Sequence, residues 1–172
     1  MSRRRFPAHL IVFGIVFLLL VAWSMWRNGH RAHLPAELNA SDPRCGALAS
    51  MWPHVYHARR LQVVAQCLSA TGTVMHIRSE PDGDLHVRLA LDGGQDDLLN
   101  EANRSQQHGD LVVEVICEHN ITQEDAIISC SGWDQRFELR QREHVRVVGS
   151  YVVDREHGWM ELHPVSSVEE LP

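Results

Sequence analysis

Histidines and carboxylates alternate with apolar residues in several segments of this chain, and they are the side chains best suited to chemistry. Successive side chains of a β-strand point to opposite faces, so residues two apart share a face. Trp159, Glu161 and His163 have this spacing, as do Asp84 and His86. The full set of candidate ligand-binding residues is Asp84, His86, Glu114, His157, Trp159, Glu161 and His163.

Two kinds of site could be built from these residues. Imidazole nitrogens and carboxylate oxygens are common protein ligands of Zn²⁺, and a bound divalent metal can activate water. An exposed tryptophan among polar groups instead favours a small-molecule or protein ligand. No other cofactor is predicted. The simplest interpretation is that the histidines are solvated cross-strand partners, worth only about 0.2–1 kcal/mol per pair.

The strongest structural prediction is a β-hairpin that carries several of these residues. β-branched and aromatic residues are frequent in 144–153 and 159–165, and the polar segment 154–158 between them contains a glycine. Such runs on either side of a Gly-containing turn are typical of a hairpin. In its second arm, Met160 and Leu162 should face the core, opposite the candidate site residues.

Three strands are predicted before the hairpin. The first is long, 61–78, and Gly72 within it indicates a bend or bulge. The Asp-Gly pair in 80–83 predicts a turn. Residues 84–91 alternate cleanly, and the apolar run 111–117 should lie in mid-sheet.

A helix is predicted over 122–130, where Thr122 can cap it and acidic residues suit its positive end. The polar connection 92–109 suggests only a short helical turn around 97–103. The element order therefore has one short helix between the third and fourth of five strands. This is the plan of a mainly β, OB-fold-like barrel, whose second and third strands usually form the ligand face.

The N-terminal part of the chain predicts a membrane segment. Residues 8–26 contain no Asp, Glu, Lys or Arg, and a helix of this length covers about 28 Å, close to the hydrocarbon thickness of a bilayer. The arginines in 1–7 favour a cytoplasmic N-terminus and an extracytoplasmic C-terminal domain. We therefore expect a single-pass signal anchor in a bacterial cell membrane. The alternative is secretion after signal cleavage at Ala22-Trp23-Ser24.

The chain beyond this span is strongly acidic. Residues 32–172 contain 11 arginines and 22 aspartates and glutamates, a formal charge of −11. Phosphate recognition needs Lys or Arg, so nucleic acid is disfavoured as a partner. The segment 27–60 is expected to be a linker with a short helix that Pro53 stops, followed by the domain at 61–166 and a tail at 167–172.

Four cysteines follow the membrane segment. An even number in an oxidising compartment predicts disulfides. A Cys117–Cys130 bridge would close a short loop, and a Cys45–Cys67 bridge would tie the segment before the domain to its first strand. Zinc bound through these thiolates is the alternative, although no Cys-x-x-Cys spacing occurs.

Several blocks of sequence occur in a characteristic order: Thr71-Gly72-Thr73-Val74, Asp82-Gly83-Asp84-Leu85-His86, Asp110-Leu111-Val112-Val113-Glu114 and His157-Gly158-Trp159-Met160-Glu161-Leu162-His163-Pro164. Together they resemble a family of bacterial extracytoplasmic OB-like domains. The resemblance spans roughly 61–166 and implies the fold and the compartment, but no catalytic residue. Asp82-Gly83-Asp84 is also similar to a motif of staphylococcal-type thermonucleases. Leu85 replaces the usual Thr there, which does not support nuclease activity.

The sequence thus favours a membrane-tethered, extracytoplasmic binding module whose ligand contacts Trp159, His86 and Glu114. The alternative is a metal-dependent hydrolase, thermonuclease-like or other, that uses the same face. This alternative requires the histidines and glutamates to converge within coordination distance. A structural envelope domain without a small ligand is the third hypothesis.

Overall fold

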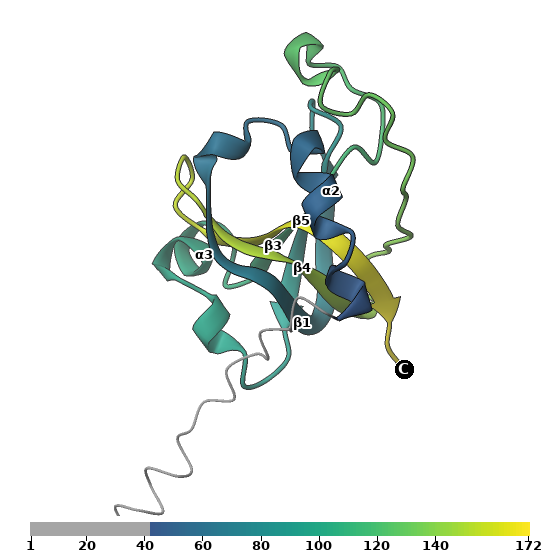
Figure 1. Cartoon of the computed structure of the whole chain (residues 1–172). Helices are drawn as coiled ribbons and strands as arrows, with labels where there is room; N and C mark the ends of the chain where they lie inside the picture. The colour runs from purple at the N-terminus through teal and green to yellow at the C-terminus, as the bar shows by residue number, and fades with distance from the viewer. Residues whose placement is uncertain (1–41) are drawn as a thin grey trace, which may run out of the picture. The chain divides into compact units, whose positions relative to one another are not determined.

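The computed structural model describes residues 42–172, and its main feature is a five-stranded sheet (Figure 1). The strands are β1 (Leu61–Ser79), β2 (Leu85–Leu91), β3 (Leu111–Val115), β4 (His144–Asp154) and β5 (Met160–Glu170). Hydrogen bonds join them in the order β1-β2-β3-β5-β4 and close the sheet into a barrel. β3 and β5 are parallel, and the other pairs are antiparallel. The predicted mainly β, five-stranded fold is confirmed.

Within residues 42–172 the helices are short and lie before β1 and in the connections between strands. They are the α-helices α2 (Leu48–Met51) and α3 (Glu101–Gln106), and the 3₁₀ turns η1 (Pro43–Cys45), η2 (Trp52–His54), η3 (Ala58–Arg60), η4 (Asp96–Leu98) and η5 (Glu124–Ala126). The prediction of a helix over 122–130 is wrong, because only η5 forms there. The helix α3 lies instead between β2 and β3.

Tertiary contacts explain why the helix forms in the β2–β3 connection. The side chain of Asn103 in α3 is buried, donates to the carbonyl oxygen of Met160 at 2.9 Å and accepts from its amide at 2.8 Å. By contrast, Ile127 and Ile128 are 55% and 80% exposed. A helix over 122–130 would therefore have little apolar surface packed against the barrel, and isolated short helices are unstable in water.

The barrel interior is filled by apolar side chains at alternate strand positions. β2 contributes Val87 and Leu89, β3 contributes Leu111 and Val113, and β5 contributes Leu162, all of them buried. The predicted alternation is therefore confirmed on the inner face. Removing this apolar surface from water is the main force that stabilises the fold.

Gly72 marks the point at which β1 changes partner. It pairs with Val145 of β4 and also with β2. A Cβ at this position would lie 2.3 Å from the carbonyl oxygen of Ala90, so glycine is needed for the close approach of the two backbones. The predicted bulge is not at this residue: β1 shifts register at 63–68 and at 74–76.

The segment expected as the end of the linker packs on the outside of the barrel. Its α-helix α2 ends at Met51, just before Pro53, and only the 3₁₀ turn η2 follows, so the predicted end of the short helix near the proline is confirmed. The segment and the strands beneath it form a second apolar cluster made of Cys45, Leu48, Met51, Val55, Leu61, Cys67, Ile116, Cys117, Val148 and Val152. Residues 42–60 therefore belong to the folded unit.

Both predicted disulfides are present. Cys45 is bonded to Cys67, and Cys117 is bonded to Cys130. The alternative of zinc bound through the thiolates is therefore wrong, because a disulfide sulfur carries no thiolate charge. One bridge fastens the segment before β1 to that strand, and the other fastens the loop after β3.

The predicted cytoplasmic segment 1–7, the membrane anchor 8–26 and the beginning of the linker lie outside the described residues. Within 42–172, no helix combines the length and the apolar character needed to cross a membrane. At the other end, β5 continues to Glu170, beyond the expected domain boundary at 166. Most of the predicted tail is thus part of the sheet.

Candidate functional site

The candidate residues come together on the outer face of the barrel, but they do not form the exposed surface that we expected. The side chains of Glu161 and His163 are fully buried, with 0% exposure, and Asp84, His86 and Glu114 are also buried. The segment after β3 lies against part of this region, because the amide of Cys117 donates to Oδ1 of Asp84 at 2.7 Å. Sequence alternation alone identified this face as polar and could not show that other segments cover it.

A first hydrogen-bonded group lies on β5 and the turn before it. Nε1 of Trp159 donates to Oε2 of Glu161 at 2.9 Å, and Nδ1 of His163 lies 3.0 Å from Oε1 of the same carboxylate. Burial acts to lower the pKa of His163, but the hydrogen bond and charge of Glu161 and the nearby acidic groups outweigh it, so this pKa is raised. Glu161 thus joins an indole and an imidazole that tends to be protonated.

A second group joins β2, β3 and the end of α3. Nδ1 of His86 lies 2.7 Å from Oε1 of Glu114, and its Nε2 lies 3.2 Å from Oε1 of Gln107. Burial lowers the pKa of His86 and raises the pKa of Glu114 well above its usual range, which favours the uncharged form of both. A neutral His86 that donates from Nε2 to Gln107 accepts at Nδ1, and a protonated Glu114 is the donor that suits this tautomer.

Asp84 lies between these two groups and the Cys117–Cys130 bridge. Its Oδ1 accepts a hydrogen bond from the amide of Cys117 at 2.7 Å, and its Oδ2 is 3.9 Å from Nε2 of His163. Burial raises the pKa of Asp84 to about 7, although the charge of His163 opposes the shift. Nε2 of His163 has no hydrogen-bond partner within the described part of the chain.

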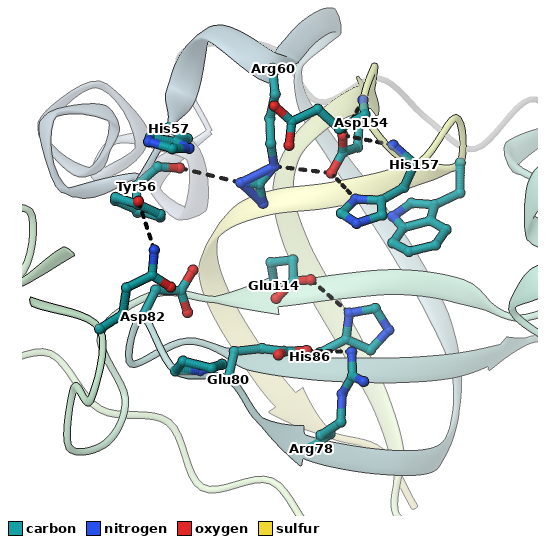
Figure 2. A pocket seen from close by; sticks show the side chains of 14 residues that line it. Tyr56, His57, Arg60, Arg78, Glu80, Asp82, His86, Glu114, Asp154 and His157 are labelled. Carbon is teal, nitrogen blue, oxygen red and sulfur yellow. Dashed lines mark hydrogen bonds and ion pairs between the residues drawn. The ribbon is translucent and has the colours of Figure 1, made fainter. Parts of the chain in front are cut away.

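A pocket of about 240 Å³ opens beside the second group. Figure 2 shows His86 and Glu114 on the strand side of this pocket and Tyr56, His57 and Arg60 on the opposite side. Of the sequence candidates, the pocket is lined by His86, Glu114, His157 and Trp159. Asp84, Glu161 and His163 do not line it. Glu161 supports Trp159, which does, and His163 is bonded to Glu161.

Aromatic rings stack in pairs at two places in the pocket wall. The ring of His157 lies parallel to that of Trp159 with a centroid distance of 4.3 Å. Tyr56 and His57 stack at 4.0 Å. Flat, apolar ring faces beside hydrogen-bonding groups are typical of sites that bind small polar molecules.

Sequence reasoning missed the ion-paired side of the pocket. Asp154 accepts from Nε of Arg60 at 3.0 Å and lies 2.7 Å from Nδ1 of His157. Burial acts to raise the pKa of Asp154, but its hydrogen bonds and the charge of Arg60 outweigh burial and lower the pKa, which keeps the carboxylate ionised. The three-residue spacing of Asp154 and His157 across a tight turn was the available signal. Nothing in the sequence pointed to Arg60.

The geometry does not support the metal-dependent alternative. Within 42–172, the only group of three or more metal-ligand side chains with atoms within 4.8 Å of one another is Asp84, Cys117 and Cys130. The two cysteines of this group are disulfide-bonded. The candidate histidines and glutamates form separate hydrogen-bonded pairs and do not surround a common point closely enough for a shared ion.

Comparison of the chain with protein-family models and with curated proteins found no match. The pocket and its surroundings are therefore the basis on which a function can be assigned.

Proposed function

We propose that this chain is a membrane-tethered, extracytoplasmic binding module with an OB-fold-like barrel, and that it binds a small polar ligand in the pocket beside Glu114. The observation that carries the proposal is the pocket itself, in which a buried carboxyl group and two stacked aromatic pairs share one cavity. The residues that support this pocket are held by buried hydrogen bonds. Such a supported, pre-formed arrangement is typical of binding sites.

The charges around the pocket indicate the kind of ligand. Its lining contains two arginines and five carboxyl groups. Arg60 is paired with Asp154 and Arg78 with Glu80, and Glu114 is favoured in its uncharged form. The remaining carboxylates, Asp82 and Glu156, therefore favour a neutral or cationic ligand. The cavity is smaller than the roughly 300–1,000 Å³ of pockets for drug-sized molecules, so the ligand should be small.

Three observations support the fold and the compartment. The strand order β1-β2-β3-β5-β4 is what a five-stranded Greek-key barrel of the OB type requires. Two disulfides favour an oxidising compartment. The apolar span at 8–26, preceded by arginines, favours a membrane tether with the domain outside the cytoplasm.

A ligand screen with two matched variants tests the proposal. The full chain is screened by ligand-observed NMR against neutral monosaccharides, amino sugars and small amines. For any compound that binds, His157→Ala should weaken binding at least tenfold, because it removes a stacked ring and a partner of Asp154 from the pocket wall.

The control is His144→Ala. His144 is also a partly exposed histidine that contacts an aspartate, Asp92, at 2.9 Å, but it does not line the pocket. Equal binding by the two variants would place the ligand elsewhere. If no compound of these classes bound, the structural envelope hypothesis would be favoured over the binding module.

A further inference from the structure

A second hollow lies on the other side of His86, over β1, β2 and the end of α3. It has a volume of about 290 Å³, and the residues that line it include His76, Arg78, His86, Arg88, Gln107 and His108. Arg78 and His86 line both this hollow and the pocket described above. The two cavities are therefore neighbours on one face of the barrel.

Strand register places the basic residues of this hollow together. Arg78 of β1 is opposite His86 of β2, and His76 is opposite Arg88. Residues two apart on a strand share a face, so all four side chains are on the outer surface of the β1–β2 pair. The arrangement is a property of the barrel and does not depend on a flexible loop.

The lining of this hollow differs in composition from the domain around it. No carboxylate is found among the described residues that line it, whereas two arginines and three histidines are. Residues 32–172 as a whole have twice as many acidic residues as arginines. Glu80 pairs with Arg78 and Asp110 contacts Arg88, but neither carboxylate lines the hollow. The lining therefore offers cationic and other N–H donors without a carboxylate beside them, which favours an anion.

Arg88 retains hydrogen-bonding capacity for such an anion. Its side chain is only 21% exposed, and its contact with Asp110 is 3.4 Å, longer than the 2.7–2.9 Å typical of a charge-assisted hydrogen bond. Within 42–172 its guanidinium makes no other side-chain hydrogen bond or ion pair. A guanidinium has five N–H donors in a planar fork that fits the oxygens of a carboxylate or phosphate.

We propose that this hollow is a binding site for a small oxyanion, namely a phosphate, sulfate or carboxylate group, with Arg88 as its principal donor and Arg78, His76 and His108 around it. His86 connects the two cavities, so a single ligand that occupied both would be polar at one end and acidic at the other. This last step rests on the proposed function. The anion site itself does not.

The test is titration of the full chain with inorganic phosphate, sulfate and acetate, followed by amide NMR shifts at constant ionic strength maintained with sodium chloride. At least one anion should produce saturable shifts at 76–78, 86–88 and 108. Arg88→Gln should weaken binding at least tenfold, and Arg88→Lys should weaken it less because the charge is retained. Comparison of the three anions identifies which oxyanion class the hollow prefers.

Arg146→Gln is the matched control, because Arg146 is also on a strand and paired with one acidic residue, Glu169, but does not line the hollow. It should leave anion binding unchanged. The proposal would be overturned if the shifts failed to saturate, or if Arg88→Gln and Arg146→Gln weakened anion binding equally. Either result would indicate only a general screening of charge. Thermal midpoints of the variants exclude unfolding as the cause of a loss.

The His157→Ala variant separates this inference from the proposed function. His157 lines the first pocket and not the hollow, and its substitution leaves His86, Glu114 and the arginines in place, so this variant should bind the same anion with unchanged affinity. If an anion bound in the hollow but no compound bound in the first pocket, the anion site would be supported and the proposed binding module would not.

Discussion

The two faces of β2, β3 and β5 are buried to a similar degree, yet they hold opposite kinds of side chain. Leu89, Leu111 and Leu162 fill the inside of the barrel, whereas Glu161 and His163 are just as inaccessible on the outside. The inner face is stabilised by removal of apolar surface from water. The outer face must offset the loss of hydration of its charged groups through hydrogen bonds. Its stability should therefore depend on exact pairing and on pH, and that of the inner face should not.

The largest expected effect follows removal of the central acceptor on the outer face. Glu161→Ala leaves the indole of Trp159 and the imidazole of His163 without their partner. Breaking a buried, charged hydrogen-bonded group in this way typically costs about 3–5 kcal/mol. The free energy of unfolding, measured by chemical denaturation, should fall by that amount.

Glu161→Gln is the control for this effect. A glutamine can still accept from Trp159 with its oxygen and donate to Nδ1 of a neutral His163 with its amide. It should lose much less stability than the alanine variant. Equal losses for the two variants would mean that packing, and not pairing, stabilises the outer face.

The pH dependence of stability should also distinguish the two faces. The pKa of Asp84 is about 7 in the folded protein, against roughly 3.9 in an unfolded chain. The folded state therefore binds the proton more tightly, and the contribution of Asp84 to stability falls as pH rises from about 4 to about 7. Since one pKa unit is about 1.4 kcal/mol, the full loss is on the order of 4 kcal/mol.

Asp84→Asn should remove this loss, because an amide does not titrate and its oxygen can still accept from the amide of Cys117. The stability difference between variant and parent should be small near pH 4 and should grow in favour of the variant up to about pH 7. The charges facing Asp84 come from Asp82, Arg60 and His163, and subtraction of the two pH curves cancels much of their own titration. A constant difference at all pH values would show that Asp84 has an ordinary pKa.

How far the sequence could predict this molecule depends on where the controlling contacts lie. The hairpin of β4 and β5 and the inner alternation of β2 follow from period-two patterns and a Gly-containing turn, which are local signals. The two disulfides followed from their positions relative to the strands. These features were predicted because a few neighbouring residues determine them.

Features that depend on distant segments were not predictable in the same way. The side chain of Asn103 fastens α3 to the barrel by a hydrogen bond to Met160, which is far from it in sequence. A pattern of apolar and polar residues within one segment cannot predict such a long-range contact. Glu161 and His163 are on the face of β5 that the sequence pattern predicts to be polar. They are buried because other parts of the chain cover that face. The candidate residues were therefore identified by type and spacing, but their environment was predicted incorrectly.

A substitution inside the barrel should be insensitive to pH. Leu89→Ala removes a fully buried side chain and should reduce the free energy of unfolding by about 2–5 kcal/mol. Leu91→Ala, a half-buried position on the same strand, is the matched control and should lose less. Both losses, measured by denaturation at pH 5 and pH 8, should be the same at the two pH values. If the loss of stability in Leu89→Ala changed with pH, the inner and outer faces would not differ in their dependence on pH.

The Cys117–Cys130 bridge connects the outer face to the loop that follows β3. It closes a loop with a sequence separation of 13, and a loop of that size stabilises by about 3 kcal/mol in the chain-entropy model. For a domain of this size, Cys117→Ser with Cys130→Ser should lower the thermal midpoint by about ten degrees, since each kcal/mol shifts it by about 3–4 °C. Scanning calorimetry measures this shift directly.

The same double variant should affect the outer face selectively. Asp84 accepts from the amide of Cys117, so release of the loop should admit water and return the pKa of Asp84 toward its usual range. The fall in stability between pH 4 and pH 7 should then become shallower than in the parent chain. Cys45→Ser with Cys67→Ser is the comparison, because that bridge holds the segment over the second apolar cluster and not the loop beside Asp84. If both double variants changed the pH dependence equally, the loop after β3 would not be what keeps water from Asp84.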